Sequence, residues 1–262
     1  MTVKFKMDGN LAIATFADGP MNLLTMKSFY GLMEAVDQAI ENKARALLTL
    51  AEGDHFCAGA HVVENFLGQD ANFARRMLSG AIPEMHRFEN LPFPTIVAVR
   101  GMCLGGGCEI LQLHDIAFAS ETANFGQVEA RIGTTTLLGG AQRLVARVGL
   151  QRAKEMVLTA GIYDAKTMLD WGLLNKVYAD DAVEAKAYTF AKRLSEGPTV
   201  AYAASKHMIN AAVSHGMGAA DLRLADAAAG TFATADMVGS VNRFAKEGAD
   251  ILVKGLLEFK GE

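Results

Sequence analysis

Apolar residues fall into two patterns along the chain. Some form short continuous runs bounded by Gly, Pro, Asp or Asn, which is typical of buried strands. Others recur at helical spacing, as between Thr25 and Asn42, where the threonine hydroxyl can cap the helix. The pattern predicts strands over 3–7, 11–16, 46–51, 95–99, 115–119 and 173–178. It predicts helices over 25–42, 70–90, 108–113, 140–148, 151–159, 165–171, 181–195, 199–214, 218–230 and 236–247.

The mixture of elements changes near residue 195. Before it, strands and helices mix, and the first two runs flank Asp8-Gly9-Asn10, which is typical of a hairpin turn. After it, an alanine-rich helical pattern dominates. We therefore expect an α/β core over 1–195 that carries the functional site, followed by a helical part over 196–262.

The most informative stretch is 94–109, PTIVAVRGMCLGGGCE. It predicts a buried strand, a tight loop, a glycine triplet at 105–107 and then a helix. Backbone N–H groups without neighbouring Cβ atoms can approach a ligand closely, and the first turn of a helix leaves such groups unpaired. This stretch therefore favours a site for a negatively charged oxygen.

Two kinds of negative oxygen are candidates. A dinucleotide phosphate requires G-x-G-x-x-G, but the third glycine position is Ile110, and no G-x-x-x-x-G-K-[ST] is present. The alternative is an oxyanion hole, whose donors face a carbonyl that develops charge. Glu109 follows in the first helical turn, either as a capping-box residue or as a catalytic acid.

Composition narrows the function classes. The net charge of −4 and the lack of a basic tract argue against nucleic acid. No apolar stretch is long enough to span a membrane, and Lys4, Lys6 and Asp8 interrupt any signal-peptide core. Cys57, Cys103 and Cys108 match no zinc spacing, so we expect no metal, reduced thiols and a cytoplasmic protein.

Several motifs together resemble the crotonase superfamily, the enoyl-CoA hydratase/isomerase group. They are FCAGA at 56–60, AVRGMCLGGGCE at 98–109, NFGQVE at 124–129, GGAQRLVARVG at 139–149 and VLTAGIYDAKTMLDWGLLNKV at 157–177. The resemblance implies an α/β fold built as a spiral of ββα units. It also implies a homotrimer or a dimer of trimers assembled through the C-terminal helices.

The resemblance also assigns site residues. The thioester carbonyl of an acyl-CoA would lie between the N–H groups of Ala60 and Gly106, and the two acids map onto Glu109 and Glu129. Coenzyme A enters as part of the substrate, and no cofactor is permanently bound. The residues expected to contact the substrate or its CoA are Asn22, Leu23, Ala58, Ala60, His61, Val62, Gly105, Gly106, Leu137 and Phe244.

The chain departs from the family pattern at several positions. His61 stands where Asp is usual, and Val63 replaces a lysine that often meets the CoA phosphates. Val128 replaces a proline before the second acid. Thr136 and Leu137 stand at two positions where the family commonly has Pro and Gly, and we expect both to line the acyl pocket.

The favoured hypothesis is a 2-enoyl-CoA hydratase, because isomerases of this family commonly keep only the second acid. Another reaction through the same enolate is the first alternative: isomerisation, C–C cleavage or thioester hydrolysis. The second is a non-catalytic relative that binds acyl-CoA or RNA. The acidic net charge argues against RNA, and the two retained acids argue against a relative that has lost activity.

Overall fold

A six-stranded sheet forms the centre of the computed structural model, which describes residues 2–248, 250–251 and 258–262. The first two strands are antiparallel and every later neighbour pairs in parallel. In spatial order the strands are β1 (Val3–Asp8), β2 (Leu11–Phe16), β3 (Ala46–Ala51), β4 (Thr95–Val99), β6 (Ile116–Ser120) and β9 (Lys176–Tyr178). A smaller sheet contains β5 (Met102–Leu104), β7 (Asn124–Gly126) and β8 (Tyr163–Asp164).

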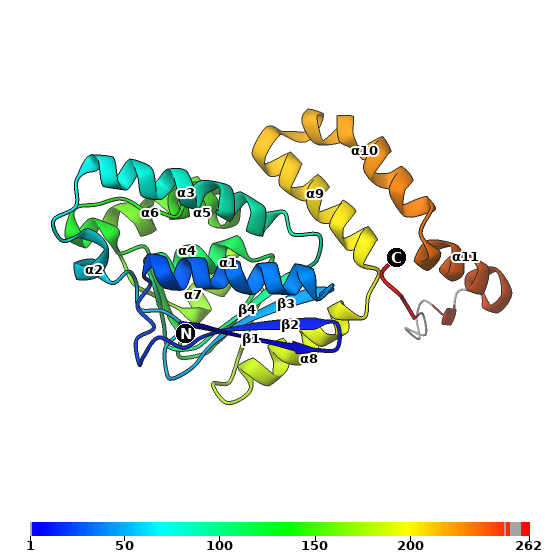
Figure 1. Ribbon diagram of the computed structural model, residues 1–262, viewed down its shortest axis with the longest axis horizontal. Helices are drawn as coiled ribbons and strands as arrows, with labels where there is room; N and C mark the ends of the chain where they lie inside the picture. Colours follow the sequence, from blue (N-terminus) through cyan, green and yellow to red (C-terminus); the bar gives the residue numbers. More distant parts are fainter. Residues whose placement is uncertain (1, 249, 252–257) are drawn as a thin grey trace.

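Helices cover both faces of the large sheet, because successive residues of a strand point to opposite sides. Leu47 and Val97 join the core cluster that contains α1 (Met26–Glu41). Leu48 and Ile96 belong to the cluster that contains α8 (Val183–Ser195). Figure 1 shows α1 above the strands and α8 below them. Burial on both faces explains why these strands read as continuous apolar runs.

A repeated unit connects the two sheets. The chain runs from β4 into β5 of the small sheet and then into α4 (Gly106–Leu113). It next runs from β6 into β7 and a 3₁₀ turn, Glu129–Ile132. The repeat of two strands followed by a helical turn is the ββα spiral that the resemblance implied. It places the starts of α4 and of the 3₁₀ turn close together.

The remaining helices pack around this frame. Thr25 caps α1 in a full capping box with Ser28, as the hydroxyl at that position predicted, and Asp70 caps the long helix that follows. Besides α1, α4 and α8, the helices of the core are α2 (Val62–Phe66), α3 (Ala71–Glu89), α5 (Gly140–Val148), α6 (Leu150–Thr159) and α7 (Ala165–Trp171). Among the described residues, no helix is both long and apolar enough to cross a membrane.

The C-terminal helices lie to one side of the core, on the right of Figure 1. They are α9 (Thr199–His215), α10 (Met217–Phe232) and α11 (Ala235–Glu247). Residues 258–262 return to this part, where the Asp236 carboxylate accepts from the backbone N–H groups of Lys260 and Gly261. Arg45 connects the core to it by donating to Thr199 Oγ1 and to the Phe259 carbonyl.

Some sequence-based expectations need correction. The loop predicted after β4 contains β5, and the irregular stretch 123–133 contains β7 and the 3₁₀ turn. The short helix α2 and the two-residue strand β8 were not predicted. The predicted strand over 173–178 begins only at Lys176. All of these elements have two to five residues, and their formation depends on neighbours distant in sequence and not on local periodicity.

Candidate active site

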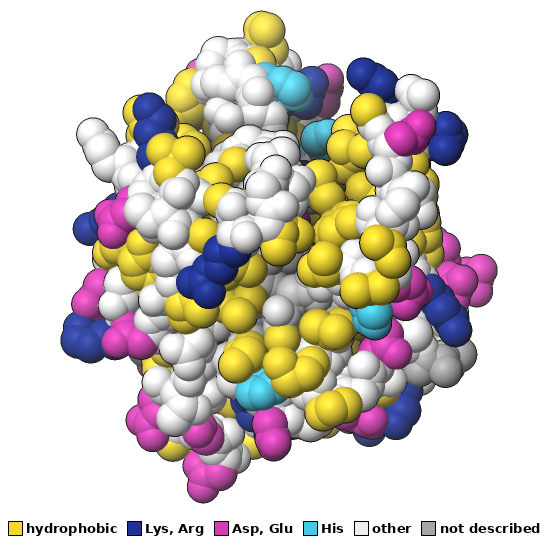
Figure 2. All heavy atoms as spheres, turned by 90° about the vertical axis from the view of Figure 1, so that its left-hand side faces the viewer, with side chains coloured by type: hydrophobic (Ala, Val, Ile, Leu, Met, Phe, Trp, Pro, Cys, Tyr) yellow, Lys and Arg dark blue, Asp and Glu magenta, His cyan; other side chains and the backbone are white. Residues whose placement is uncertain are grey.

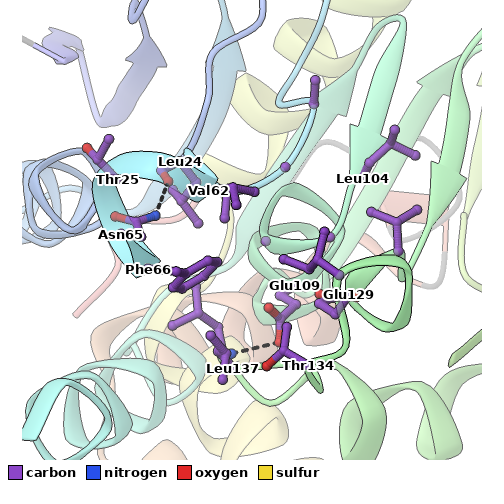
Figure 3. A pocket seen from close by; sticks show the side chains of 18 of the residues that line it. Leu24, Thr25, Val62, Asn65, Phe66, Leu104, Glu109, Glu129, Thr134 and Leu137 are labelled. Carbon is purple, nitrogen blue, oxygen red and sulfur yellow. Dashed lines mark hydrogen bonds between the residues drawn. The ribbon is translucent and has the colours of Figure 1, made fainter. Parts of the chain in front are cut away.

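A cavity of about 260 Å³ opens where α1, α2, α4 and the 3₁₀ turn converge. Its wall is mainly apolar, and two carboxylates, Glu109 and Glu129, face it (Figure 3). Of the residues expected from the sequence, those in the lining are Ala58, Ala60, Val62, Gly105, Gly106, Glu109, Glu129 and Leu137. An apolar cavity with a few convergent polar groups is the usual form of a small-molecule site.

The glycine triplet is needed for three different physical reasons. Gly105 has φ +48°, in the left-handed region that L side chains rarely adopt. A Cβ at Gly106 would lie 2.7 Å from Leu24 Cδ2. A Cβ at Gly107 would lie 2.5 Å from the Cys57 carbonyl oxygen, and backbone cannot move aside as a flexible side chain can. The triplet therefore lets α4 begin directly against the loop that contains Ala60.

Two backbone N–H groups flank the cavity at this junction. Leu24 pairs in parallel with Ala60, bonding to the residues on either side of it: Leu24 N–H donates to Gly59, and His61 N–H donates to Leu24. In parallel pairing this pattern turns the N–H of Ala60 away from Leu24. Gly106 is the first residue of α4, where N–H groups have no partner inside the helix. Ala60 and Gly106 both line the cavity, an arrangement that suits a developing oxyanion.

Glu109 is buried at the base of the cavity, with 2% of its surface exposed. Its Oε1 accepts from the N–H groups of Leu138 (2.7 Å) and Gly140 (2.8 Å), at the start of α5. These bonds stabilise the ionised form, but burial and the charge of Glu129 oppose it and raise the pKa of Glu109 to about 7. The capping-box alternative is wrong, because Gly105 is the cap and has no side-chain partner.

Glu129 opens the 3₁₀ turn and lies beside Glu109 in Figure 3. Burial raises the pKa of Glu129, while a hydrogen bond from Glu109 lowers it. A Cβ added at Gly105 would lie 3.5 Å from Glu129 Oε1, so the carboxylate reaches the glycine loop. Two coupled carboxyls of this kind lose their protons in two steps that belong to the pair. The pair can accept a proton at one oxygen and release one from another.

Two buried amides behind this pair had no assigned role in the sequence analysis. In the orientation that satisfies its neighbours, the Gln127 amide donates to both oxygens of Glu129 and accepts from Gln112. Gln127 lies in the quoted motif NFGQVE, so its position was visible. Its contacts were not, because they join a strand end to the last turn of α4. The wall residues Asn65, Phe66, Met77 and Thr134 were missed for the same reason.

Four expected contact residues lie outside the cavity lining. Asn22 is buried, and its amide is bonded to the carbonyls of Glu52 and His55, so it shapes the loop. Leu23 is adjacent to it in that loop. The remaining two are His61 and Phe244: His61 caps α2 by accepting from Glu64 N–H, and Phe244 is 43% exposed on α11.

The departures from the family pattern separate into lining and supporting positions. Leu137 lines the cavity as expected, but Thr136 does not: its Oγ1 accepts from Ala141 N–H at the start of α5. Val128 lines the cavity beside Glu129. Figure 2 faces the end of the molecule that carries α2 and shows apolar side chains gathered around a hollow. The exposed apolar residues of this end include Val62, Val63 and Leu67.

The other reactive side chains near α4 support the fold. His114 is fully buried between the Ile110 carbonyl and Thr49 Oγ1, and burial lowers its pKa to about 3, so it is neutral. Burial also raises the pKa of the Cys57 thiol to about 11, which removes its thiolate at neutral pH. In the described part of the chain, no three His, Cys, Asp or Glu side chains are grouped to hold a metal ion.

Comparison with known proteins shows which family the chain resembles in sequence and in fold. A relative from Clostridium acetobutylicum, named Short-chain-enoyl-CoA hydratase, is 34% identical over 217 residues, which cover 79% of this chain and 80% of the relative. The solved structure of Enoyl-CoA Hydrates Subunit I from Geobacillus kaustophilus has a TM-score of 0.91 at 25% identity and covers 100% of this chain and 99% of that one. An enoyl-CoA hydratase structure from Bacillus anthracis shares the fold, with a TM-score of 0.89 at 24% identity over 100% of both chains. The family described as Enoyl-CoA hydratase/isomerase matches residues 6–249, and the chain belongs to that family.

Proposed function

We propose that the protein is a 2-enoyl-CoA hydratase, which adds water across the 2,3 double bond of an enoyl thioester. The observation that carries the proposal is the pair Glu109 and Glu129, which face one cavity beside the N–H groups of Ala60 and Gly106. The relative named Short-chain-enoyl-CoA hydratase supports the same reaction.

The acid pair supplies both proton transfers. A water held between the carboxyls loses a proton to the ionised one as its oxygen bonds to C3 of the substrate. The protonated carboxyl gives its proton to C2. The pair ends with one proton, as it began, so no other acid or base is consumed. A carboxyl whose pKa is near 7 suits this work, because it both holds and releases a proton at neutral pH.

The two backbone donors act on the thioester oxygen. Addition at C3 places negative charge on that oxygen as an enolate forms. The N–H groups of Ala60 and Gly106 stabilise this charge in a water-poor cavity, where hydrogen bonds are stronger than in water. Removal of one such donor typically lowers kcat by about 10²–10³-fold. Because backbone N–H groups and two carboxyls supply all of this chemistry, the proposed mechanism uses CoA only as part of the substrate and needs no bound cofactor.

The acyl group would lie on the apolar wall beyond the acids. Phe29 of α1, Phe66 of α2 and Met77 of α3 line the cavity together with Leu137. Leu137 replaces a glycine of the family pattern and adds a side chain next to Glu109 in Figure 3. We assign Leu137 as the residue that limits acyl groups close to the reacting carbons.

We also propose that the core 1–195 carries the chemistry and that 196–262 assembles copies of the chain into a trimer or a pair of trimers. The C-terminal helices expose many large apolar side chains, which a neighbouring copy would bury. They are Ile209, Val213, Met217, Leu222, Leu224, Phe232, Val238, Val241 and Phe244. In such an assembly Phe244 would reach the CoA of a neighbouring subunit. The free thiols of Cys57, Cys103 and Cys108 favour the cytoplasm.

The test follows the loss of enoyl-thioester absorbance with trans-2-enoyl-CoA esters of increasing chain length. We expect turnover of at least one ester and formation of the 3-hydroxyacyl product. Tight binding of these esters without turnover would overturn the hydratase assignment. Isomerase, C–C lyase and thioester hydrolase substrates would then be tested on the same oxyanion site.

A further inference from the structure

A buried chain of two amides leads from α4 to the carboxylate of Glu129. Gln112 is 1% exposed and Gln127 is fully buried. Gln112 Nε2 donates to Gln127 Oε1 over 2.7 Å. Gln127 Nε2 donates to Glu129 Oε1 over 3.0 Å and to Oε2 over 3.2 Å. Glu109 and Gln112 are three residues apart on α4, so one helix supports both acids.

The orientation of the Gln127 amide depends on Gln112. An amide presents N–H on one side and an acceptor on the other, and only the N–H side can face an ionised carboxylate. Gln112 uses its N–H groups on Gln127 and on the Cys108 carbonyl (3.1 Å). Its own Oε1 has no hydrogen-bond partner among the described residues, although it is buried. A buried acceptor without a partner costs stability, so this side chain is not explained by packing.

We infer that Gln112 is a positioning residue: by donating to Gln127 it holds that amide with its nitrogen facing both oxygens of the Glu129 carboxylate. The inference rests on the proposed function of the acid pair and adds a residue that touches neither substrate nor acid. Without the Gln112 donor, the Gln127 amide can turn its oxygen toward Glu129. In that orientation Glu129 would have to be protonated, because an ionised carboxylate cannot donate to the amide oxygen. Glu109 is the ionisable group that acts on Glu129 in the described chain. The neighbouring Arg131 donates to the Ala160 carbonyl instead.

The test replaces Gln112 by Met, which is similar in length and has no N–H. Leu113→Met is the matched control, since Leu113 is also buried on α4 and has no polar contact to lose. For Gln112→Met we expect kcat to fall about tenfold with KM unchanged, because the loss lies in proton transfer. We expect the acidic limb of the kcat/KM profile to move up by about half a pH unit or more, because ionised Glu129 loses its fixed donors. Thermal stability should stay about equal, since the unpaired Gln112 Oε1 is removed but Gln127 Oε1 loses its donor.

A double-mutant cycle tests whether Gln112 acts through Gln127. If it does, the variant with both Gln112→Met and Gln127→Met should be no slower than Gln127→Met alone. Equal and additive losses, or a Gln112→Met enzyme that matches Leu113→Met in kcat and pH profile, would overturn the inference. If Gln112→Met lowers thermal stability, Gln112→Leu takes its place in the same cycle.

A measurement on the free protein separates this inference from the proposed function. Infrared difference spectra across a pH series follow the carboxyl stretch of the buried acid pair without any substrate. The first ionisation of the pair should move to higher pH in Gln112→Met and stay in place in Leu113→Met. This result would stand even if wild-type protein turned over no enoyl-CoA. An unchanged first ionisation would overturn the inference, whatever the reaction.

Discussion

The backbone N–H of Gly140 donates to Oε1 of Glu109 over 2.8 Å, which places the acid at the N-terminus of α5. The positive end of a helix favours an ionised carboxylate there. Burial and the nearby Glu129 charge favour the neutral acid more strongly, and the pKa of Glu109 rises to about 7 as a result. Because these effects oppose one another, Glu109 can exchange protons near neutral pH.

The first prediction concerns stability and pH. A carboxyl whose folded pKa is raised stabilises the fold below its unfolded pKa, and this contribution is lost as pH rises through the folded pKa. The pKa of Glu109 rises from 4.5 to about 7, so the loss spans that window and reaches about 3 kcal/mol. Glu109→Gln keeps the acceptor for Gly140 but cannot ionise. Its stability relative to wild type should therefore increase with pH, as measured by urea unfolding.

The comparison between variant and wild type is needed because His114 acts in the opposite direction. Its lowered pKa removes stability as pH falls below about 6.5 in both proteins. The His114 contribution therefore cancels when the stability of wild type is subtracted from that of Glu109→Gln. Glu121→Gln, on an exposed turn, is the control and should track wild type at every pH. A gap between Glu109→Gln and wild type that stays constant with pH would contradict the raised pKa.

The second prediction concerns Gly140. A Cβ there would overlap the Gln127 amide and lie 2.9 Å from Glu109 Cγ. Gly140→Ala should therefore displace the acid pair and lower kcat by roughly a hundredfold, a size typical of misplaced catalytic groups. Gly239→Ala is the matched control, because nothing lies within 4 Å of its added Cβ in the middle of α11. A kcat equal to that of wild type in Gly140→Ala would contradict the prediction that catalysis depends on the position of the acids.

The third prediction concerns acyl selectivity. Leu137 lines the cavity next to Glu109, so Leu137→Gly should enlarge the space at the reacting carbons. We expect kcat/KM to rise about tenfold or more for esters branched near the double bond relative to straight esters, since even one methylene in an apolar pocket is worth about 10–200-fold. Thr136→Val, which removes only the hydroxyl bonded to Ala141, should leave the ranking of esters unchanged. Identical rankings for wild type and Leu137→Gly would remove Leu137 from the acyl site.

The fourth prediction concerns assembly. Leu222 is 86% exposed and Phe232 is 67% exposed on α10. A charge at both positions, in Leu222→Glu with Phe232→Glu, should convert a trimer into monomers in light scattering, because burial of an unpaired charge is costly. Leu158→Glu, at a 75% exposed position of α6, is the control and should leave the assembly intact. A wild-type monomer would contradict the proposed assembly.

Much of the architecture could be predicted from the sequence because it depends on local patterns. The run 95–99 is β4, and Thr25 caps α1 through its hydroxyl. The acids Glu109 and Glu129 and the expected oxyanion donors Ala60 and Gly106 lie far apart in sequence and were assigned by the resemblance of their motifs, so their roles stay predictions. In the strand β4 and the cap of α1, by contrast, neighbours in sequence are also neighbours in space.

The supporting contacts of the site could not be predicted in this way. The bond from Gly140 to Glu109 spans 31 residues, and the amide chain joins α4 to the end of β7. Thr136 was expected in the acyl wall, but its hydroxyl caps the start of α5. A short polar side chain can serve either role, and only the packed structure distinguishes them.

The role of the acid pair is tested most directly by the hydration of trans-2-enoyl-CoA esters by wild type, Glu109→Gln and Glu129→Gln under the same conditions. We expect turnover by wild type and a fall in kcat of roughly 10³-fold or more in each variant, since each loses one of two proton transfers. We also expect that the two losses are not additive when both substitutions are combined in one protein, because the carboxyls act as a unit. Full activity in either single variant, or a wild type that binds the esters without hydrating them, would contradict hydration by the pair Glu109 and Glu129.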